Sequence, residues 1–477
     1  MVPPAEEGCG LPQDTPPRPL VGSHHAARPQ HDDAGDATGA LTLALNEAPG
    51  RTSPGLRASG GPPPHPREEP VTTADHRRLG RDLDLFDTDP LIGAGLPFWL
   101  PDGATVRHTL EEYVRGLERE AGYVHVYSPA LGKRALYEKS GHWAHYRDGM
   151  FPPLDDGGDQ LVLRPSLCPH HALLYRSRGR SHRELPLRVA ELGDMYRHEP
   201  SGSLGGLTRV RAIRLNDAHI FCTPDQVVDE TADALDLIGR AHRALGITPL
   251  RHRLSLPGPG GKYAGEAATW ERATGLLVSA LEQAGLDWEE GPGEAAFYGP
   301  KIDVQIADPA GRESTLSTVQ VDLHQPERFD LHYTGPDGAR HRPVMVHRSV
   351  IGSIERVVAH LIEVHQGAFP AWLAPLQTIA LPVTPDQEAA AAHLADRARR
   401  RGLRADTAPA GTGALGARIR THRLVPYQAV IGAREAAQDT VAVRLRDGRR
   451  LPPLPAEEFL DRAAALTAAH TTDLWDE

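Results

Sequence analysis

Hydrophobic and polar positions alternate along two neighbouring stretches near the middle of the chain, residues 187–199 and 209–221. Period-two alternation of this kind predicts β-strands. The residues between the two stretches include four turn-formers, which are Pro200, Gly202, Gly205 and Gly206. The pattern therefore predicts a β-hairpin joined by a Gly/Ser-rich loop.

Charged side chains gather on one side of this predicted hairpin. Because side chains alternate across a strand, Arg197 and Glu199 share one face of the first strand. By the same rule, Asp217 and His219 share one face of the second strand. A cation, two carboxylates and an imidazole can therefore converge on one surface. The residues alone fit equally well a charged hairpin with one face in water.

Helical periodicity marks three further stretches. Apolar residues at helical spacing over 105–121 predict an amphipathic helix, which a strand at 124–127 follows. Thr223 and Gln226 form a capping-box pattern, with Pro224 at the first helical position, and predict a helix that ends near residue 245. Apolar positions from Ile354 onward predict another helix.

After Phe369-Pro370 the pattern changes to alternating strands and helices. Strands are expected at 378–383, 427–432 and 440–445, and helices at 385–401 and from about residue 455. This alternation is typical of a small, separate α/β domain.

Residues 1–74 lack apolar periodicity and are rich in Pro, Gly, His and Ala, so we expect a disordered tail. Within it, Ala40 to Ala48 is the one stretch that fits a short helix or strand. The Gly-rich run at 257–263 is not a phosphate-binding P-loop, because Tyr263 stands after Lys262 where that motif requires Ser or Thr.

Composition adds that the protein is globular and acidic, with a net charge of −11. The chain has no long apolar run for a membrane span and no signal-peptide core, which predicts a soluble cytoplasmic protein. Its three cysteines, Cys9, Cys168 and Cys222, do not form a disulfide framework. Between residues 395 and 423, however, eight arginines stand against two aspartates, a local balance of +6, which predicts a confined basic surface.

Five blocks carry a family resemblance. YRHEPSG followed by LTRVRAIRLNDAHIF, over 196–221, resembles motif 2 of class II aminoacyl-tRNA synthetases, and specifically of the threonyl-tRNA synthetase family. Further blocks resemble signatures of that family in the same order, namely LRPSLCPHH at 163–171, FYGPKID at 297–303, STVQVD at 317–322 and VMVHRSVIGSIER at 344–356. Ordered blocks over such a length are far more specific than one short motif.

The resemblance implies an α+β fold. We expect a class II catalytic core over 75–372, with an antiparallel sheet flanked by helices, and a smaller α/β anticodon-binding domain over 373–477. The helix at 105–121 and the strand at 124–127 resemble motif 1, which forms the homodimer interface in the class, although an ordinary core helix and strand fit the residues equally well. Block 141–151 also matches the family, and its aromatic residues fit packing equally well. The family's N-terminal ubiquitin-like and proofreading domains do not fit into residues 1–74, so we expect no editing within this chain.

Cys168, His219 and His347 match the three zinc ligands of the family. Three protein ligands leave zinc an open position, which in the family receives the amino and hydroxyl groups of threonine. Cys222 is excluded as a ligand, because it stands three residues from His219 on one strand and so faces the other way.

The resemblance also assigns the other site residues. Arg197 and Arg356 are expected to be catalytic, and the ATP-binding set to comprise Arg197, Glu199, Arg209, Gln320 and Arg356, with Mg²⁺ accompanying ATP. The substrate-binding set comprises Asp217, Tyr298, Lys301 and Ser353. In the C-terminal domain Glu435 and Arg444 match positions that read anticodon bases.

The chain departs from the family pattern next to the metal. Ser166-Leu167 precede the cysteine where the family has Met-Asn, His170 replaces a glycine, and Leu215-Asn216 replace Gln-Asp. The segment before residue 425 is also shorter than usual. The expected function is activation of L-threonine with ATP and its transfer to threonine tRNA by a zinc enzyme, one ion per subunit. Two alternatives stay open, an enzyme that passes threonyl-adenylate to an acceptor other than tRNA, and an inactive tRNA- or amino-acid-sensing regulator.

Overall fold

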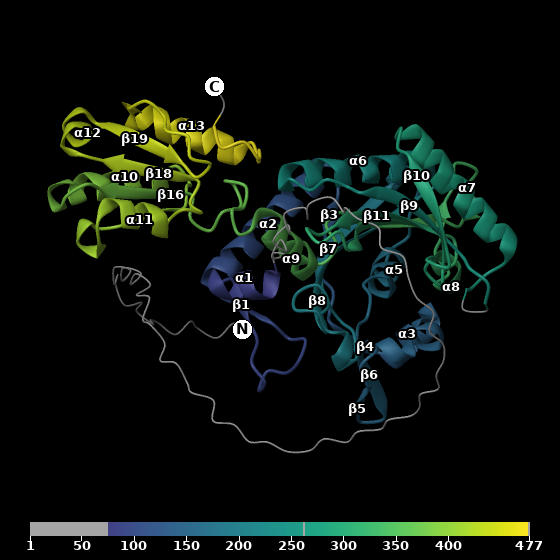
Figure 1. Ribbon diagram of the computed structural model, residues 1–477. Helices are drawn as coiled ribbons and strands as arrows, with labels where there is room; N and C mark the ends of the chain where they lie inside the picture. The colour runs from purple at the N-terminus through teal and green to yellow at the C-terminus, as the bar shows by residue number, and fades with distance from the viewer. Residues whose placement is uncertain (1–74, 261–262, 476–477) are drawn as a thin grey trace, which may run out of the picture. The chain divides into compact units, whose positions relative to one another are not determined.

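The computed structural model describes residues 75–260 and 263–475. The predicted tail, including its Ala40 to Ala48 stretch, lies outside the described residues. Figure 1 shows a large mixed sheet with helices around it and a second, smaller sheet domain formed by the C-terminal residues.

The large sheet has eight strands in the order β10-β9-β11-β12-β15-β8-β7-β3. Its neighbours pair antiparallel except at the two ends, where β10 pairs parallel to β9 and β3 parallel to β7. The strands are β3 (Val124–His125), β7 (Leu187–Tyr196), β8 (Ala212–Cys222), β9 (Arg251–Leu256), β10 (Trp288–Pro292), β11 (Lys301–Ala307), β12 (Glu313–Asp322) and β15 (Val344–Ser349). The expected α+β class with an antiparallel catalytic sheet is confirmed.

Four long helices bury their apolar stripes against this sheet to form the main core. They are α2 (Pro101–Glu120), α6 (Val227–Leu245), α7 (Ala267–Gln283) and α9 (Ile354–His365). Ala218, Ile220 and Cys222 of β8 belong to this core, whereas Phe221 belongs to a smaller core with α5 (Cys168–Arg176). The residues of β8 that alternate with the main core, including Asp217 and His219, therefore lie on the opposite face of the sheet.

The helix α9 illustrates how local sequence fixes an element. Ser353 caps its N-terminus by accepting a hydrogen bond from the backbone N–H of Arg356, at 3.2 Å. The preceding Gly352 has φ +65°, and a Cβ atom there would stand 2.4 Å from the carbonyl oxygen of Leu316. Glycine is therefore required at the point where α9 begins against β12.

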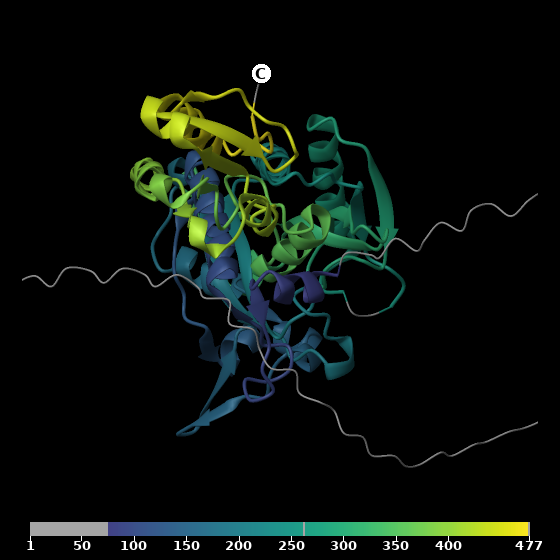
Figure 2. The same cartoon turned by 60° about the vertical axis from the view of Figure 1, so that its left-hand side comes forward.

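Smaller elements surround the sheet. Short sheets pair β1 (Phe86–Asp87) with β2 (Phe98–Trp99), β4 (Leu131–Lys133) and β5 (Leu154–Asp156) with β6 (Asp159–Leu163), and β13 (Tyr333–Thr334) with β14 (Arg340–His341). The short helices are α1 (His76–Asp82), α3 (Arg134–Ser140), α4 (His142–His145), α8 (Gln325–Arg328) and the 3₁₀ turns η1 (Arg147–Gly149), η2 (His182–Glu184) and η3 (Ser201–Ser203). In Figure 2 the β5–β6 hairpin projects at the lower left, away from the large sheet.

The C-terminal residues form a five-stranded sheet in the order β17-β16-β18-β19-β20 with its own core. Its strands are β16 (Thr378–Pro382), β17 (Ala405–Thr407), β18 (Tyr427–Ile431), β19 (Thr440–Leu445) and β20 (Leu454–Pro455). Its helices are η4 (Pro385–Gln387), α10 (Glu388–Arg400), η5 (Ala410–Thr412), α11 (Leu415–Thr421), α12 (Ala433–Gln438) and α13 (Ala456–Ala468). The predicted alternation of strands and helices is confirmed, with α12 as an element that the pattern did not predict.

Three boundary predictions were wrong. The second hairpin strand, expected from Arg209, begins at Ala212. The first hairpin strand ends at Tyr196, so Arg197 and Glu199 lie beyond it in the loop rather than on a strand face. The helix predicted from the capping box begins three residues later, at Val227. Half of the box is present, because the Gln226 side-chain oxygen accepts from the Thr223 N–H at 3.0 Å, but residues 224–226 form a turn instead of helix.

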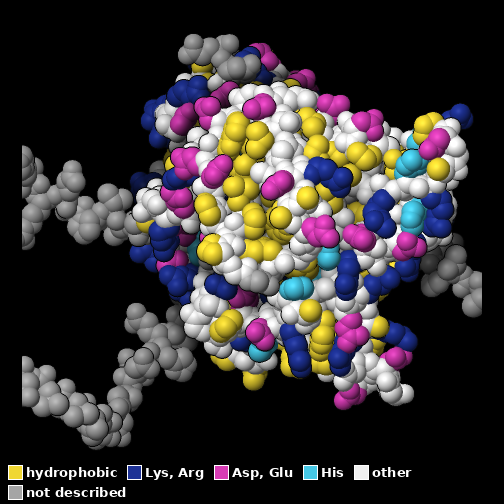
Figure 3. Space-filling view, turned by 90° about the vertical axis from the view of Figure 1, so that its right-hand side faces the viewer, with side chains coloured by type: hydrophobic (Ala, Val, Ile, Leu, Met, Phe, Trp, Pro, Cys, Tyr) yellow, Lys and Arg dark blue, Asp and Glu magenta, His cyan; other side chains and the backbone are white. Residues whose placement is uncertain are grey.

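The predicted basic surface is smaller than expected, because most arginines of the run have partners within the domain. Arg397, Arg399 and Arg401 form ion pairs with neighbouring carboxylates, while Arg404 and Arg418 donate to backbone carbonyl groups. Within the described part of the chain, this leaves three exposed members of the run without such a partner, Arg400, Arg420 and Arg423. Charges of both signs are interspersed on the face shown in Figure 3 as well, around a central patch of hydrophobic side chains.

Among the described residues, no helix combines the length and the apolar character that a membrane crossing requires.

Candidate active site

The site lies on the face of the large sheet opposite to the main helical core, where the strand register aligns polar side chains. One row of directly paired residues crosses five strands, from Ser255 through Lys301, Gln320 and His347 to His219. Because paired residues on neighbouring strands share a face, this row places the two histidines side by side. The ring centroids of His219 and His347 are 4.6 Å apart.

Cys168 completes a three-residue cluster with these histidines. It is the first residue of α5, which packs against this face of the sheet. One donor atom from each of the three side chains lies within 4.8 Å of the other two, and the exposed fractions are 1% for Cys168, 0% for His219 and 5% for His347. A thiolate and two imidazoles are the donor set that zinc prefers, and three ligands leave a fourth position open.

The ligand nitrogens fit a metal ion. His219 Nε2 is buried and has no hydrogen-bond partner among the described residues. Burial lowers the pKa of His219 well below its ordinary value, and the neighbouring His347 and His171 lower it further, so this imidazole is neutral. His347 Nε2 lies 2.8 Å from the buried Asp322 carboxylate, which leaves its other ring nitrogen for a metal.

Asp217 and Tyr298 stand next to the cluster. Asp217 Oδ2 lies 3.9 Å from His219 Nε2, and burial raises the pKa of this carboxyl to about 6 against the lowering effect of the nearby histidines. The Tyr298 ring stacks on His347 with centroids 5.0 Å apart. Both residues line a cavity of about 220 Å³.

That cavity is lined by one residue of the cluster, His347, and by two arginines. Its lining includes Asp217, Tyr298, Gln320, His347, Ser353, Arg197 and Arg356. The cavity lining also includes the apolar side chains of Met195, Ile213, Leu215 and Leu316. The departure at Leu215 therefore lies directly in the cavity wall.

The cationic end is held by contacts across three chain segments. Arg356 donates to the carbonyl oxygens of Thr315 on β12, at 3.0 Å, and of Thr208 in the hairpin loop, at 3.4 Å. Burial lowers the pKa of Arg356, and the charges of Arg197 and Arg209 lower it further, so three guanidinium groups share this region. Mutual repulsion of this kind is relieved when an anion binds.

A second cavity of about 700 Å³ continues beyond this end. It shares Thr315 and Arg356 with the first cavity and is also lined by Arg209. Glu199 accepts from Arg209 at 2.8 Å, which ties the two sides of the hairpin loop together. The two cavities therefore meet at Thr315 and Arg356, and the first is also lined by His347 of the metal-binding cluster.

The structure does not bring every predicted residue into the cavity. Lys301 is absent from the cavity lining and its ammonium group pairs with the buried Asp303 carboxylate at 2.5 Å. Gln320 lies opposite His347 in register, so it belongs to the metal end rather than to the cationic end. In the C-terminal domain Glu435 accepts from the Gly432 N–H at 3.0 Å on α12, and Arg444 stands on β19 opposite Gln428.

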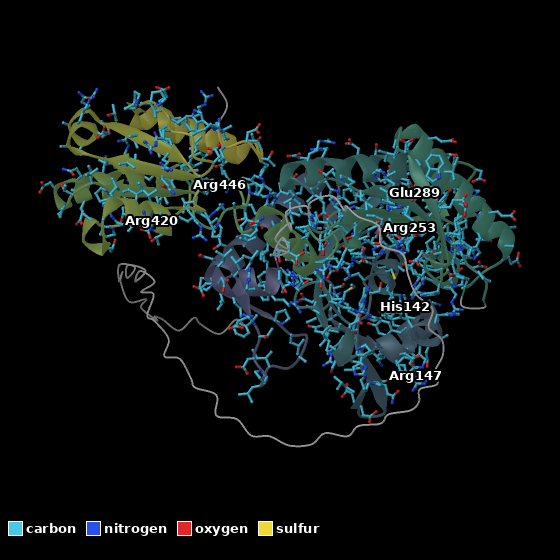
Figure 4. The ribbon with its side chains drawn as sticks, in the orientation of Figure 1. His142, Arg147, Arg253, Glu289, Arg420 and Arg446 are labelled. Atoms are coloured by element: carbon cyan, nitrogen blue, oxygen red, sulfur yellow. The ribbon has the colours of Figure 1, made fainter. Side chains whose placement is uncertain are left out.

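Sequence reasoning missed several residues around the cluster. His142, labelled in Figure 4, is 4% exposed, and its Nε2 lies 3.8 Å from Cys168 Sγ. Burial lowers its pKa to about 3, and His347 and Arg197 lower it further. His171 stands behind His219 and Thr315 lines both cavities. The Cys-x-x-His spacing of Cys168 and His171, one helical turn apart, was the signal for His171.

Comparisons with known proteins agree with this geometry. Residues 150–365 match the family model of the tRNA synthetase class II core domain (G, H, P, S and T), and residues 377–466 match the anticodon binding domain. The threonine–tRNA ligases of Anoxybacillus flavithermus and Streptococcus pyogenes are each 47% identical, over 395 and 405 residues, which is 82% and 84% of this chain. The chain spans 61% and 62% of the length of these two relatives.

Among solved structures, a crystal structure described as the RNA binding domain of threonyl-tRNA synthetase from Cryptosporidium parvum Iowa II is 34% identical with a TM-score of 0.78. The match covers 82% of this chain and 98% of that one. A prolyl-tRNA synthetase from Giardia lamblia shares the fold, with a TM-score of 0.66 at 17% identity over 83% of this chain and 81% of that one.

Proposed function

Because the chain belongs to the threonyl-tRNA synthetase family of class II aminoacyl-tRNA synthetases, we propose that it activates L-threonine with ATP and transfers the threonyl group to threonine tRNA. One observation carries the proposal. The cavity is lined by His347, which belongs to the Cys168, His219 and His347 cluster, and also by Arg197 and Arg356. An amino acid and a nucleotide can therefore lie end to end between them.

The metal end is proposed to bind the amino acid. Zinc held by Cys168, His219 and His347 supplies a Lewis-acidic position for the amino and hydroxyl groups of threonine. Asp217 stands at the entrance to this position and accepts a hydrogen bond from one of those groups. Tyr298 and Gln320 form the neighbouring walls, and Ser353 lies toward the nucleotide. A site that contacts the hydroxyl rejects valine, which lacks it.

The cationic end is proposed to bind ATP together with Mg²⁺. In the activation step a threonine carboxylate oxygen forms a bond to the α-phosphorus, and pyrophosphate leaves as the bond to the β-phosphate oxygen breaks. Arg197, which lines the same cavity as Arg356, offsets the charge on the α-phosphate. Arg356 stacks on the adenine, while Arg209 and Glu199 fix the outer part of the nucleotide.

The transfer step requires tRNA. The terminal ribose hydroxyl of threonine tRNA attacks the carbonyl carbon of the adenylate, and AMP leaves. We propose that the C-terminal domain, residues 373–477, holds the anticodon through Glu435 and Arg444, and that residues 75–372 form the catalytic domain. We also propose a cytoplasmic location for this reaction.

A homodimer through the motif 1 region is also proposed. Apolar side chains are exposed on β3, just after it and on the three-stranded sheet, with exposed fractions of 53% for Val124, 79% for Tyr127, 38% for Leu131 and 54% for Leu154. A second copy of the chain is the partner that the class II resemblance implies. Light scattering of the purified protein checks the state, and a monomer at micromolar concentration contradicts the proposal.

One experiment tests the function. Threonine-dependent ATP–pyrophosphate exchange measures adenylate formation, and charging of purified threonine tRNA then measures transfer. Exchange without charging indicates an acceptor other than tRNA, and the absence of both indicates an inactive sensor. Metal analysis of the active protein tests zinc separately, and an active preparation without zinc contradicts the metal assignment.

A further inference from the structure

His171 is a fully buried histidine that stands directly behind the metal cluster. It lies on α5 one turn after Cys168, and its exposed fraction is 0%. Its ring is perpendicular to that of His219 with centroids 4.7 Å apart, and the Nδ1 atoms of the two rings are 2.7 Å apart. That distance is a short hydrogen bond between the two imidazoles.

The other nitrogen of His171 faces a carboxylate. His171 Nε2 lies 3.2 Å from Glu191 Oε2, on β7. Glu191 also accepts from Arg164 Nη2 at 3.0 Å and from the Ser128 hydroxyl at 2.6 Å. Burial would raise the pKa of Glu191, but the hydrogen bonds from His171 and Ser128 and the charge of Arg164 lower it to about 2. Glu191 is therefore a permanent anion that only accepts hydrogen bonds.

This chain of contacts determines which nitrogens carry hydrogen. Since Glu191 accepts, we assign the hydrogen of His171 to Nε2, and His171 Nδ1 is then the acceptor in its contact with His219. His219 Nδ1 must therefore donate, which leaves the lone pair of His219 Nε2 free. That atom is the buried nitrogen without a partner in the metal cluster.

We propose that His171 and Glu191 are positioning residues, which fix the His219 ring and its tautomer so that Nε2 is presented to the metal. The proposal rests on the metal site described under the proposed function. A hydrogen-bonded carboxylate behind a ligand histidine is a recurring arrangement, and here one imidazole is inserted between the two. Removal of such an outer partner typically lowers metal affinity by about 10- to 100-fold.

A purely structural role for His171 predicts a different effect of substitutions on zinc affinity than the positioning role does. Both roles allow a loss of stability when the buried ring is replaced, but only the positioning role requires a hydrogen-bond acceptor at the Nδ1 position. His171→Asn keeps a side-chain oxygen close to that position, whereas His171→Leu fills similar volume without an acceptor. Tyr175→Phe is the matched control, because it removes another buried polar atom of α5, a hydroxyl that donates to the His332 carbonyl oxygen at 3.3 Å.

The experiment measures zinc affinity of the purified full chain by competition with a chromophoric chelator, together with the absorption spectrum of the Co²⁺-loaded protein. We expect His171→Leu to weaken zinc binding by about 10- to 100-fold and to alter the Co²⁺ spectrum. His171→Asn should recover most of the affinity, and Tyr175→Phe should bind zinc like the wild type. Equal zinc affinity for His171→Leu and wild type overturns the proposal.

Two further outcomes keep the test decisive. If His171→Leu does not fold, Glu191→Gln replaces it, because the amide keeps the shape and removes the anion that sets the tautomer. Zinc binding unchanged in Glu191→Gln then overturns the proposal. If the wild type binds no zinc at all, the metal site itself is wrong, which chelator competition detects without any measurement of threonine activation.

Discussion

Glu355 is a buried carboxyl group in the first turn of α9, next to Arg356. It is 4% exposed, and its Oε2 accepts from the Arg214 N–H at 3.1 Å, which ties α9 to β8. Burial raises the pKa of Glu355 from 4.5 to about 7, against smaller lowering contributions from backbone hydrogen bonds and Arg107. The charged form is therefore disfavoured in the folded protein.

This shift predicts how stability depends on pH. Because the folded pKa exceeds the unfolded one, the contribution of Glu355 is most favourable below pH 4.5 and is lost as the pH rises through about 7. Glu355→Gln keeps the acceptor for the Arg214 N–H. At pH 8 it should raise the free energy of unfolding by up to ~3 kcal/mol, which is measured as a higher thermal unfolding midpoint. The gain should shrink at pH 5.5. An equal gain at both pH values, or the same gain from the exposed Glu271→Gln, contradicts the assignment.

Arg356 is the second prediction at this scale. Its side chain lies in both cavities, whereas the burial of α9 depends on the fully buried Ile354, Val357 and Val358. Arg356→Ala should therefore fold normally and slow ATP–pyrophosphate exchange by about 10²- to 10³-fold, the usual cost of one missing charge-stabilising donor. Arg240→Ala, which removes an arginine paired with Glu120 outside the site, is the control. Exchange unchanged in Arg356→Ala shows that the nucleotide lies elsewhere.

At the residue scale, the sequence predicted which residue types form the site better than it predicted which side chains contact one another. The metal cluster was predicted from residue types that the family resemblance selects, and its geometry fits a metal. The roles of His171, Glu191 and Glu355 were not predicted, because they follow from which side chains meet behind the site. Lys301 was predicted to bind the substrate from its residue type, but its ammonium group forms an ion pair with the neighbouring Asp303 carboxylate.

At the scale of elements, α1 connects the hairpin loop to α9. His76 Nε2 accepts from the backbone N–H of Leu207 at 3.1 Å, and His76 Nδ1 lies 2.7 Å from Glu363 Oε1 on α9. His76 is 5% exposed. One side chain therefore fixes the loop that carries Arg209 relative to the helix that carries Arg356.

Removal of this contact should affect nucleotide binding before it affects the chemical step. His76→Ala leaves the Leu207 N–H without its partner, which costs about 1–3 kcal/mol and loosens the loop. We expect the KM for ATP in the exchange reaction to rise several-fold, with a smaller change in kcat. Arg78→Ala is the control, because Arg78 lies on the same helix, is exposed and does not line the second cavity. A KM for ATP that stays at the wild-type value contradicts a role for His76 in holding the loop.

Periodicity predicted the elements well where apolar stripes decide, as in α2, α9 and the strands of the C-terminal domain. It failed at boundaries that local hydrogen bonds decide. The Thr223 and Gln226 pair forms a turn before α6. The first hairpin strand ends at Tyr196, and the His198 N–H donates to the Gly149 carbonyl oxygen at 2.9 Å instead of continuing the strand pairing. The order of the eight strands was accessible only through the resemblance, since pairing across long sequence separations leaves no local signal.

At the scale of the whole molecule, many arginine side chains form ion pairs with carboxylates or donate hydrogen bonds to carbonyl groups. The chain has a net charge of −11, and the arginine run predicted a confined basic surface. Most arginines of that run instead meet carboxylates or carbonyl groups. Arg420, labelled in Figure 4, is one of the exposed exceptions. Contact with the negatively charged tRNA is therefore expected to depend on a few placed groups rather than on a broad positive surface.

The last prediction concerns selectivity between threonine and serine. Serine presents the same amino and hydroxyl groups to the metal end and differs by one methyl group, which is worth only about 1–3 kcal/mol, or roughly 10- to 200-fold. The described residues are organised around the eight-stranded sheet and the five-stranded sheet, and their remaining sheets have two or three strands each. We expect the 477-residue chain to charge threonine tRNA with serine at a detectable rate and not to hydrolyse the product.

The measurement is deacylation of preformed seryl-tRNA by the purified protein, with the Arg356→Ala variant as a control in which activation is slowed. Rapid release of serine that depends on the protein contradicts the prediction and reveals a hydrolytic site in this chain. Slow release together with no serine charging shows instead that the cavity wall at Leu215 and Ser166 discriminates more sharply than one methyl group allows.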